Sequence, residues 1–149
     1  MSPPVEPGER FYDPTQWEDV APGEPHVWRT FGYRRTVWEP GRTVLEWDAP
    51  AEYSFPSDNG RRIHGGLVAT ILDTAMGGAA WTVLDHHEVF LTADLRVEYL
   101  RGTRVGLLRC EGTVVRRTRR LVFCAGELFD AGGTLLATAR CTQAVLSAS

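Results

Sequence analysis

One carboxylate stands in the most apolar stretch of the chain. The stretch "HGGLVATILDTAMGGAAW", residues 64–81, carries Asp73 at its centre with no basic residue beside it. Its length and composition predict a buried helix from about Gly65 to Leu84. Burial penalises a charged carboxylate unless donors surround it, and such a setting suits a general base or a nucleophile near neutral pH. A structural role, in which Asp73 bonds a backbone group or reaches solvent, explains the residue equally well.

The start of the same helix offers hydrogen-bond donors. His64, Gly65 and Gly66 open the helix, where the first N–H groups lack intrahelical acceptors and the helix dipole is positive. Glycine leaves these donors sterically open, as an oxyanion site requires. Glycine is also common at helix starts, and His64 would explain the motif without any catalytic role if it only caps the turn.

A helical wheel predicts where Asp73 points. The residues three, four and seven positions away share its face, and they are mostly small: Gly66, Ala69, Thr70, Met76, Gly77 and Ala80. The opposite face is larger and is expected to press on a sheet: Leu67, Val68, Ile71 and Ala75. The wheel therefore predicts that Asp73 points away from the sheet, toward a ligand or a second chain.

Strands must position this helix. Residues 33–49 predict a hairpin around Pro40-Gly41, residues 50–63 are expected to be irregular, and four strands are expected near 91–99, 104–116, 120–129 and 134–146. In the first of these four, the alternation places one set of residues on a single face: Leu91, Ala93, Leu95, Val97 and Tyr99. Short links between strands favour antiparallel neighbours, so we expect an α+β fold with an antiparallel sheet curled around one helix.

The domain organisation is expected to be simple. Residues 1–30 are rich in Pro, Gly and acidic side chains and predict an irregular arm, anchored by Trp17 and Trp28, with one short helix near residues 14–21. The remaining residues, 31–149, are expected to form a single domain, because 149 residues are too few for two comfortable ones.

Composition argues against several classes of function. A net charge of −3 gives the chain no electrostatic attraction to nucleic acid, and Asp73 with the glycines and threonines around it makes residues 65–84 a poor membrane span. The three cysteines lack disulfide or zinc spacing, and no serine-hydrolase, P-loop or dinucleotide motif is present. We therefore expect no metal, no cofactor and, because the N-terminus does not resemble a signal peptide, a cytoplasmic location.

The segments "HGGLVATILDTAMGGAA" and "LTADLRVEYLRG" resemble the signature of hotdog-fold acyl-CoA thioesterases, in the PaaI-like branch near the 4-hydroxyphenylacetyl-CoA and 4-hydroxybenzoyl-CoA thioesterases. The resemblance runs from about Gly32 to Leu146. It implies an antiparallel β-sheet wrapped around one long central helix, and a homodimer, often paired into a dimer of dimers, with sites at the subunit interface. It also implies hydrolysis of an acyl-CoA, with an aromatic or medium-chain acyl group, to free acid and CoA.

The resemblance also implies roles for individual residues. Asp73 matches the general base or nucleophile, Gly65 the residue whose amide polarises the thioester carbonyl, and Thr92 a position that helps to orient water. The family commonly has an Asn six residues before the histidine, whereas this chain has Asp58 there and Asn59 one residue later. Either Asn59 serves in that role, or an Asp58 carboxylate in the site repels Asp73.

Further residues are candidates for binding the substrate. His64 and Gly66 flank the amide donor, and Met76, Ala80 and Trp81 are expected to line the acyl pocket. Two arginines of the "RRTRR" turn, Arg119 and Arg120, are candidates for holding the CoA phosphates together with the nearby Arg101 and Arg104, although a solvated turn explains the run as well. The alternative function is a non-catalytic acyl-CoA-binding or regulatory module, which would have no need of an activated acid at Asp73.

Overall fold

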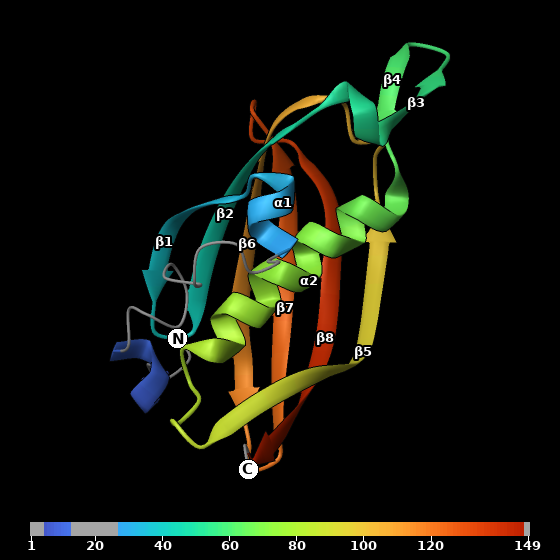
Figure 1. Cartoon of the computed structure of the whole chain (residues 1–149). Coiled ribbons are helices and arrows are strands. Elements are labelled where there is room, and N and C mark those ends of the chain that lie inside the picture. Colours follow the sequence, from blue (N-terminus) through green and yellow to red (C-terminus); the bar gives the residue numbers. More distant parts are fainter. Residues whose placement is uncertain (1–4, 13–26, 148–149) are drawn as a thin grey trace.

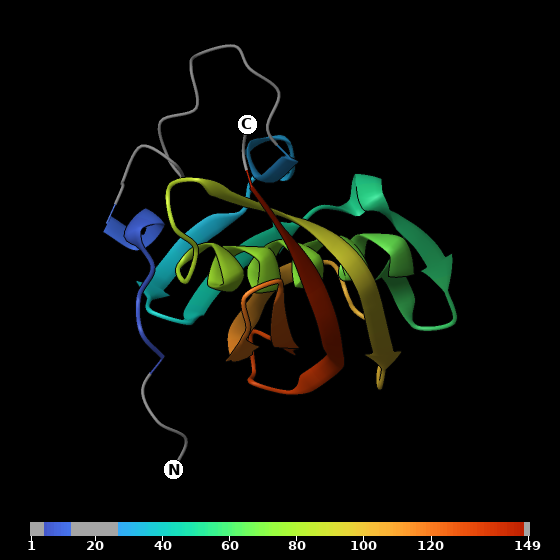
Figure 2. The same cartoon turned by 90° about the horizontal axis from the view of Figure 1, so that it is seen from below.

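A six-stranded antiparallel sheet curves around one long helix. The computed structural model describes residues 5–12 and 27–147. The sheet has the strand order β1-β2-β6-β7-β8-β5, and α2 (Gly65–Trp81) lies in its hollow (Figures 1 and 2). This arrangement confirms the α+β fold with a sheet wrapped around a central helix.

The strands of this sheet lie close to their predicted positions. They are β1 (Arg34–Glu39), β2 (Arg42–Ala49), β5 (Glu88–Tyr99), β6 (Gly106–Arg117), β7 (Leu121–Asp130) and β8 (Leu135–Ser147). The turn between β1 and β2 falls at Pro40-Gly41 as expected, and Gly41 has a φ of +75°, a conformation that glycine adopts without strain.

The segment before α2 is more ordered than predicted. Residues 50–63, expected to be irregular, contain a 3₁₀ turn, η3 (Ala51–Tyr53), and a separate hairpin of β3 (Ser54–Ser57) and β4 (Gly60–Ile63). Asn59-Gly60 lies at its turn and Gly60 has a φ of +104°. An Asn-Gly pair is a strong hairpin signal. The residues on either side of it are mostly polar and include a proline, so the sequence pattern did not indicate the two short strands. The hairpin projects beyond the N-terminal end of α2 (Figure 1).

A β-bulge changes the alternation of β5. Thr92 pairs with Gln143 and Asp94 with Thr142, so that Ala93 is an extra residue in β5. The prediction of a single face from Leu91 to Tyr99 is therefore wrong at its start, because a bulge shifts the phase of the strand by one residue. Leu91 is 64% exposed, whereas Thr92 faces α2.

The helix packs closely on the sheet because β6 has a glycine beneath it. A Cβ on Gly112 would lie 2.3 Å from the carbonyl oxygen of Ala75, and the Thr43 hydroxyl donates to the same oxygen at 2.6 Å. Met76, predicted to share the open face of Asp73, is instead fully buried and lies against Gly126 of β7. The face toward the sheet is thus broader than the wheel indicated.

The described part of the N-terminal segment packs on the domain. Arg10, in the 3₁₀ turn η1 (Glu9–Tyr12), donates to the backbone carbonyls of Asp85, His86 and Glu88. The short helix α1 (Val27–Phe31) spans the predicted boundary at residue 30, and its Trp28 packs against the core. The predicted helix near residues 14–21 and the predicted anchor Trp17 lie outside the described residues.

Within the described ranges, no helix has both the length and the apolar character needed to cross a membrane. The three cysteines, Cys110, Cys124 and Cys141, are buried free thiols.

Candidate active site

Asp73 faces the edge strand of the sheet. The side chain is half-buried, and its Oδ1 accepts a hydrogen bond of 2.9 Å from the Thr92 hydroxyl of β5. The wheel predicted that Asp73 points away from the sheet, but the bulge turns Thr92 toward the helix and gives the carboxylate a partner there. No hydrogen bond to Oδ2 is found among the described residues, so this oxygen is available to a substrate or a water molecule.

The first turn of α2 leaves one amide donor free. His64 is the N-cap, and its Nδ1 accepts a 3.2 Å hydrogen bond from the N–H of Gly66. The N–H of Gly65 has no acceptor within the residues that the structure describes. Of the two glycine amides, Gly65 therefore presents the open donor at the positive end of the helix dipole, while His64 and Gly66 satisfy each other.

Asp73 and Gly65 lie too far apart in one protomer to act on the same carbonyl. They are eight residues apart on one helix, which corresponds to about 12 Å along its axis. Each is bonded to β5, Asp73 through Thr92 and Gly65 through Tyr99, whose hydroxyl donates to the Gly65 carbonyl at 2.7 Å. The strand that holds both groups is at the edge of the sheet and pairs on one side only, with β8.

Asp58 and Asn59 both lie at the exposed turn of the β3-β4 hairpin. Neither side chain forms a hydrogen bond with another described residue, Asp73 included.

An apolar cavity adjoins Gly65. It has a volume of about 330 Å³, and apolar side chains from the hairpin, α2 and the end of β5 line most of it: Phe55, Ile63, Val68, Tyr99 and Leu100. The residues predicted for the acyl pocket lie elsewhere in the protomer. Met76 and Ala80 are fully buried, and Trp81 stacks edge-on against Phe90 and under Arg10.

Three arginines gather next to this cavity. Arg62 and Arg101 line both it and a neighbouring cavity of about 580 Å³, whose wall also includes Arg104. Arg62 and Arg104 are direct neighbours across a β-bridge, and none of the three forms an ion pair with a described carboxylate. Sequence reasoning named Arg101 and Arg104 as candidates for holding phosphates but missed Arg62, because it treated "GRRI" as part of an irregular segment.

Arg119 and Arg120 lie elsewhere. They form the turn between β6 and β7, whereas Arg101 and Arg104 precede the other end of β6. Twelve residues of β6 separate the two groups, which corresponds to about 35 Å. The expectation that all four arginines are neighbours is thus wrong for a single protomer.

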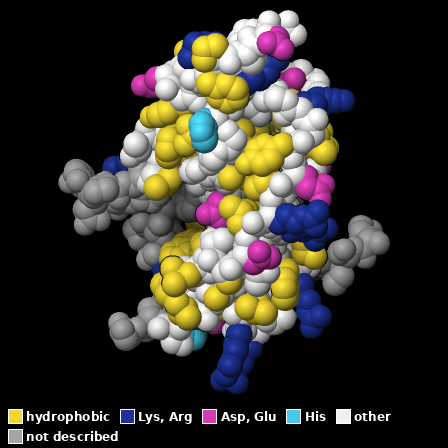
Figure 3. Space-filling model, turned by 90° about the vertical axis from the view of Figure 1, so that its right-hand side faces the viewer, with side chains coloured by type: hydrophobic (Ala, Val, Ile, Leu, Met, Phe, Trp, Pro, Cys, Tyr) yellow, Lys and Arg dark blue, Asp and Glu magenta, His cyan; other side chains and the backbone are white. Residues whose placement is uncertain are grey.

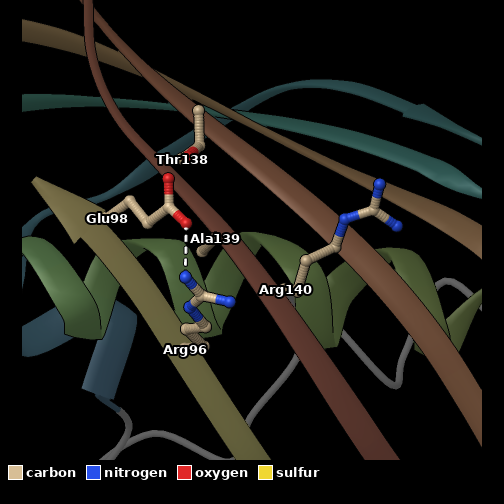
Figure 4. A pocket seen from close by; sticks show the side chains of 5 residues that line it. All are labelled: Arg96, Glu98, Thr138, Ala139 and Arg140. Atoms are coloured by element: carbon tan, nitrogen blue, oxygen red, sulfur yellow. Dashed lines mark hydrogen bonds and ion pairs between the residues drawn. The ribbon is translucent and has the colours of Figure 1, made fainter. Parts of the chain in front are cut away.

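A further hollow lies on the outer face of the sheet. Arg96 and Glu98 of β5 and Thr138, Ala139 and Arg140 of β8 line a cavity of about 180 Å³, with α2 behind the strands (Figure 4). Arg96 donates to Glu98 at 2.7 Å. The hollow is polar and contains neither Asp73 nor Gly65. Among the described residues, no group of three His, Cys, Asp or Glu side chains is placed to hold a metal ion.

Comparisons with known proteins agree with this geometry. Residues 60–137, just over half of the chain, match the family model of the thioesterase superfamily. A protein of Saccharolobus solfataricus that is provisionally named an esterase is 32% identical over 101 residues, which cover 68% of this chain and 69% of that protein.

Solved structures share the fold. A thioesterase family protein from Silicibacter pomeroyi superposes with a TM-score of 0.76 at 24% identity, covering 93% of this chain and 97% of that one. A phenylacetic acid degradation-related protein from Ralstonia eutropha has a TM-score of 0.76 at 25% identity over 91% and 98%. The PaaI protein of E. coli has a TM-score of 0.73 at 15% identity over 83% and 86%. The chain therefore belongs to the thioesterase superfamily and is a thioester hydrolase with the hotdog fold.

Proposed function

We propose that the chain hydrolyses acyl-CoA thioesters at sites shared by two copies of itself. The observation that carries the proposal is the separation of Asp73 from Gly65. A base and an oxyanion donor about 12 Å apart on one helix cannot meet on a single carbonyl. A second copy placed antiparallel brings Asp73 of one protomer to the partner's Gly65.

The edge strand β5 supports this pairing. A twelve-residue edge strand with unpaired backbone groups on one side is a template for another strand. Pairing β5 with its own copy around Leu95 places Asp94 opposite the partner's Arg96, which are opposite charges. Tyr99 and Leu100 are about half exposed at one end of this edge, and hydrophobic side chains gather among charged ones on this side of the molecule (Figure 3).

The same register assembles the site. Thr92, which bonds Asp73, lies within one residue of the position opposite the partner's Tyr99, which bonds the partner's Gly65. Two equivalent sites follow from the twofold symmetry. The pairing of such dimers into a tetramer stays a prediction.

The chemistry follows from the groups so assembled. In one route Asp73 takes a proton from water, and the hydroxide adds to the thioester carbonyl while the partner's Gly65 N–H stabilises the oxyanion. The carbon–sulfur bond then breaks, and the sulfur takes the proton from Asp73. In the other route the carboxylate itself adds to the carbonyl, the CoA thiolate leaves, and water hydrolyses the mixed anhydride. Thr92 orients the carboxylate in both routes.

Acyl-CoA as the substrate is supported by the neighbouring surfaces. The cluster of Arg62, Arg101 and Arg104, which forms no ion pair with a described carboxylate, offers guanidinium groups for phosphates next to the free amide. The apolar cavity contains the rings of Phe55 and Tyr99 and fits an aromatic acyl group. The Ralstonia eutropha and E. coli proteins above are named for phenylacetic acid degradation, which favours the same class. The free thiols favour a cytoplasmic location.

The test removes each catalytic group separately. Gly65→Pro deletes the amide N–H with little change to the backbone, because proline is well tolerated at the first helical position and His64 already has the extended conformation, φ −57° and ψ 132°, that precedes proline. We expect kcat for a panel of aromatic and medium-chain acyl-CoA thioesters to fall about 100-fold to 1000-fold. We expect the kcat of Asp73→Asn to fall at least as far. The melting temperature of both variants should stay near that of wild type.

Mixing the two inactive variants tests the shared site. A mixed dimer of Gly65→Pro and Asp73→Asn has one site with both defects and one with neither. After unfolding and refolding together at equal amounts, we expect about a quarter of wild-type specific activity, because half of the dimers form with one intact site. No recovery would refute sharing, and full activity of either variant alone would remove that residue from the chemistry. Binding of acyl-CoA without turnover by wild type would favour the binding module.

A matched pair of variants tests the proposed phosphate-binding site. Arg101→Glu with Arg104→Glu is expected to raise KM for acyl-CoA about tenfold or more, whereas the same change of charge at Arg119 and Arg120 is expected to raise it less. Neither pair should alter KM for the N-acetylcysteamine thioester of the same acid, which has no phosphates. A larger rise in KM from the change at Arg119 and Arg120 would indicate that the phosphates bind at that turn instead.

A further inference from the structure

The peptide group between Gly65 and Gly66 is held at both ends by side chains. Its carbonyl accepts a 2.7 Å hydrogen bond from the Tyr99 hydroxyl, and its N–H donates to His64 Nδ1 at 3.2 Å. The N–H of His64 in turn donates to the carbonyl of Tyr53 at 3.0 Å. The turn that carries the free amide of Gly65 is thus fixed from three directions.

We infer that Tyr99 is a positioning residue for the oxyanion donor, an inference that rests on the proposed function. Glycine restricts its own backbone less than any other residue, and the first turn of a helix frays readily. Two consecutive glycines at this turn leave the direction of the Gly65 N–H poorly defined unless other groups hold it. The Tyr99 bond fixes the plane of the next peptide group and so limits rotation at Gly65.

The ring of Tyr99 reinforces its hydroxyl. A Cβ built on Gly65 would lie 3.6 Å from the Tyr99 ring and hydroxyl, which is ordinary packing contact. The ring therefore lies against the glycine without forcing the residue to be one. Tyr99 is 53% exposed and lines the apolar cavity beside Gly65. Because about half of the Tyr99 surface is exposed in the protomer, burial restrains the side chain only in part, and the hydroxyl bond to Gly65 adds a specific restraint.

His64 holds the other end of the same peptide group. By accepting the N–H of Gly66, its Nδ1 removes the competing donor and leaves Gly65 as the one that a carbonyl oxygen meets. An asparagine at this position also presents an acceptor to the first turn of a helix. Tyr99 and His64 thus act on the two ends of one peptide group, and their effects on catalysis should be coupled.

The experiment compares Tyr99→Phe with Tyr12→Phe, which removes the hydroxyl of a 70% exposed tyrosine in η1. We expect Tyr99→Phe to lower kcat about tenfold, less than loss of the donor itself, with KM and the melting temperature nearly unchanged. Tyr12→Phe should keep wild-type kinetics. His64→Asn is expected to lose less activity than His64→Ala, and the Tyr99→Phe, His64→Ala double variant to lose less than the product of the two single losses.

A binding measurement separates positioning from a general structural effect. A CoA analogue with a trifluoromethyl ketone in place of the thioester adds water to form a tetrahedral hydrate, one oxygen of which takes the position of the oxyanion, whereas the matching CoA thioether without a carbonyl has no such oxygen. Tyr99→Phe should weaken the ketone about tenfold and leave the affinity of the thioether unchanged.

Unchanged kcat in Tyr99→Phe, equal weakening of both analogues, or independent effects of Tyr99 and His64 would each overturn the inference. These outcomes are distinct from failure of the proposed function, in which wild type itself would not hydrolyse the thioesters.

Discussion

Because α2 packs directly on β6 at Gly112, we expect a larger residue at this position to destabilise the fold strongly. A Cβ there would lie 2.3 Å from the Ala75 carbonyl oxygen and 2.7 Å from the Met76 nitrogen. Both are backbone atoms, so no rotamer change relieves the contact, and the helix must move by about 1 Å to reach normal separation. Overpacking costs about 1–3 kcal/mol, and stretching the buried Thr43 bond to Ala75 adds about 1 kcal/mol.

We therefore expect Gly112→Ala to lower the free energy of unfolding by about 3 kcal/mol, or the melting temperature by about 10 °C. Asp73 is two residues from Ala75 and moves with it. A displacement of about 1 Å at a reacting group costs about 100-fold in rate, so kcat/KM should fall by about that factor even at temperatures where the variant is folded.

Gly126→Ala is the matched control. Gly126 also lies beneath α2, but an added Cβ would meet side-chain atoms of Leu72 and Met76 at 3.2 Å, and these can rotate away. We expect a loss of about 1 kcal/mol or less. Urea unfolding at a fixed protomer concentration measures both. Equal losses in the two variants, or an unchanged urea midpoint for Gly112→Ala, would refute the argument from backbone contact.

Two further outcomes are expected. Thr92→Val keeps the shape of the side chain but removes the donor to Asp73, so kcat should fall about tenfold with KM little changed. Thr92→Ser keeps a hydroxyl and should retain more activity. A fully active Thr92→Val would show that this hydrogen bond has no role in catalysis. Burial raises the pKa of the Cys110 thiol, so at pH 8 it should be neutral and resist iodoacetamide in the native protein but react in urea. Mass spectrometry of the labelled peptide would decide, and rapid native labelling would contradict the burial.

Most of the fold could be predicted because its signals are local. The hairpin at Pro40-Gly41 and the three C-terminal strands follow from turn residues and alternation, and each lies within two residues of its expected bounds. The β3-β4 hairpin and the bulge at Ala93 could not be predicted in the same way. A short hairpin with polar flanks has no periodic pattern, and a bulge becomes visible only when the two strands are paired.

The same distinction between local signals and contacts of distant segments applies to the candidate site. Asp73, Gly65 and the capping role of His64 could be predicted, because a carboxylate in an apolar helix and glycines at its start are visible in one segment. The arginine cluster could not, because Arg62 and Arg104 become neighbours only through a bridge between distant segments. The placement of Met76 in the core also depends on Gly126, which a helical wheel does not include.

The extra residue in β5 has a consequence for how such a chain can evolve. Loss of the single codon for Ala93 would remove the bulge but keep Thr92 opposite Gln143 and on the face toward α2, because Thr92 and Asp94 already occupy successive positions on the partner strand. The bulge therefore absorbs a length change of one residue without turning the hydroxyl away from the carboxylate. The length of this edge strand is thus open to variation while the contact between the strand and the helix is retained.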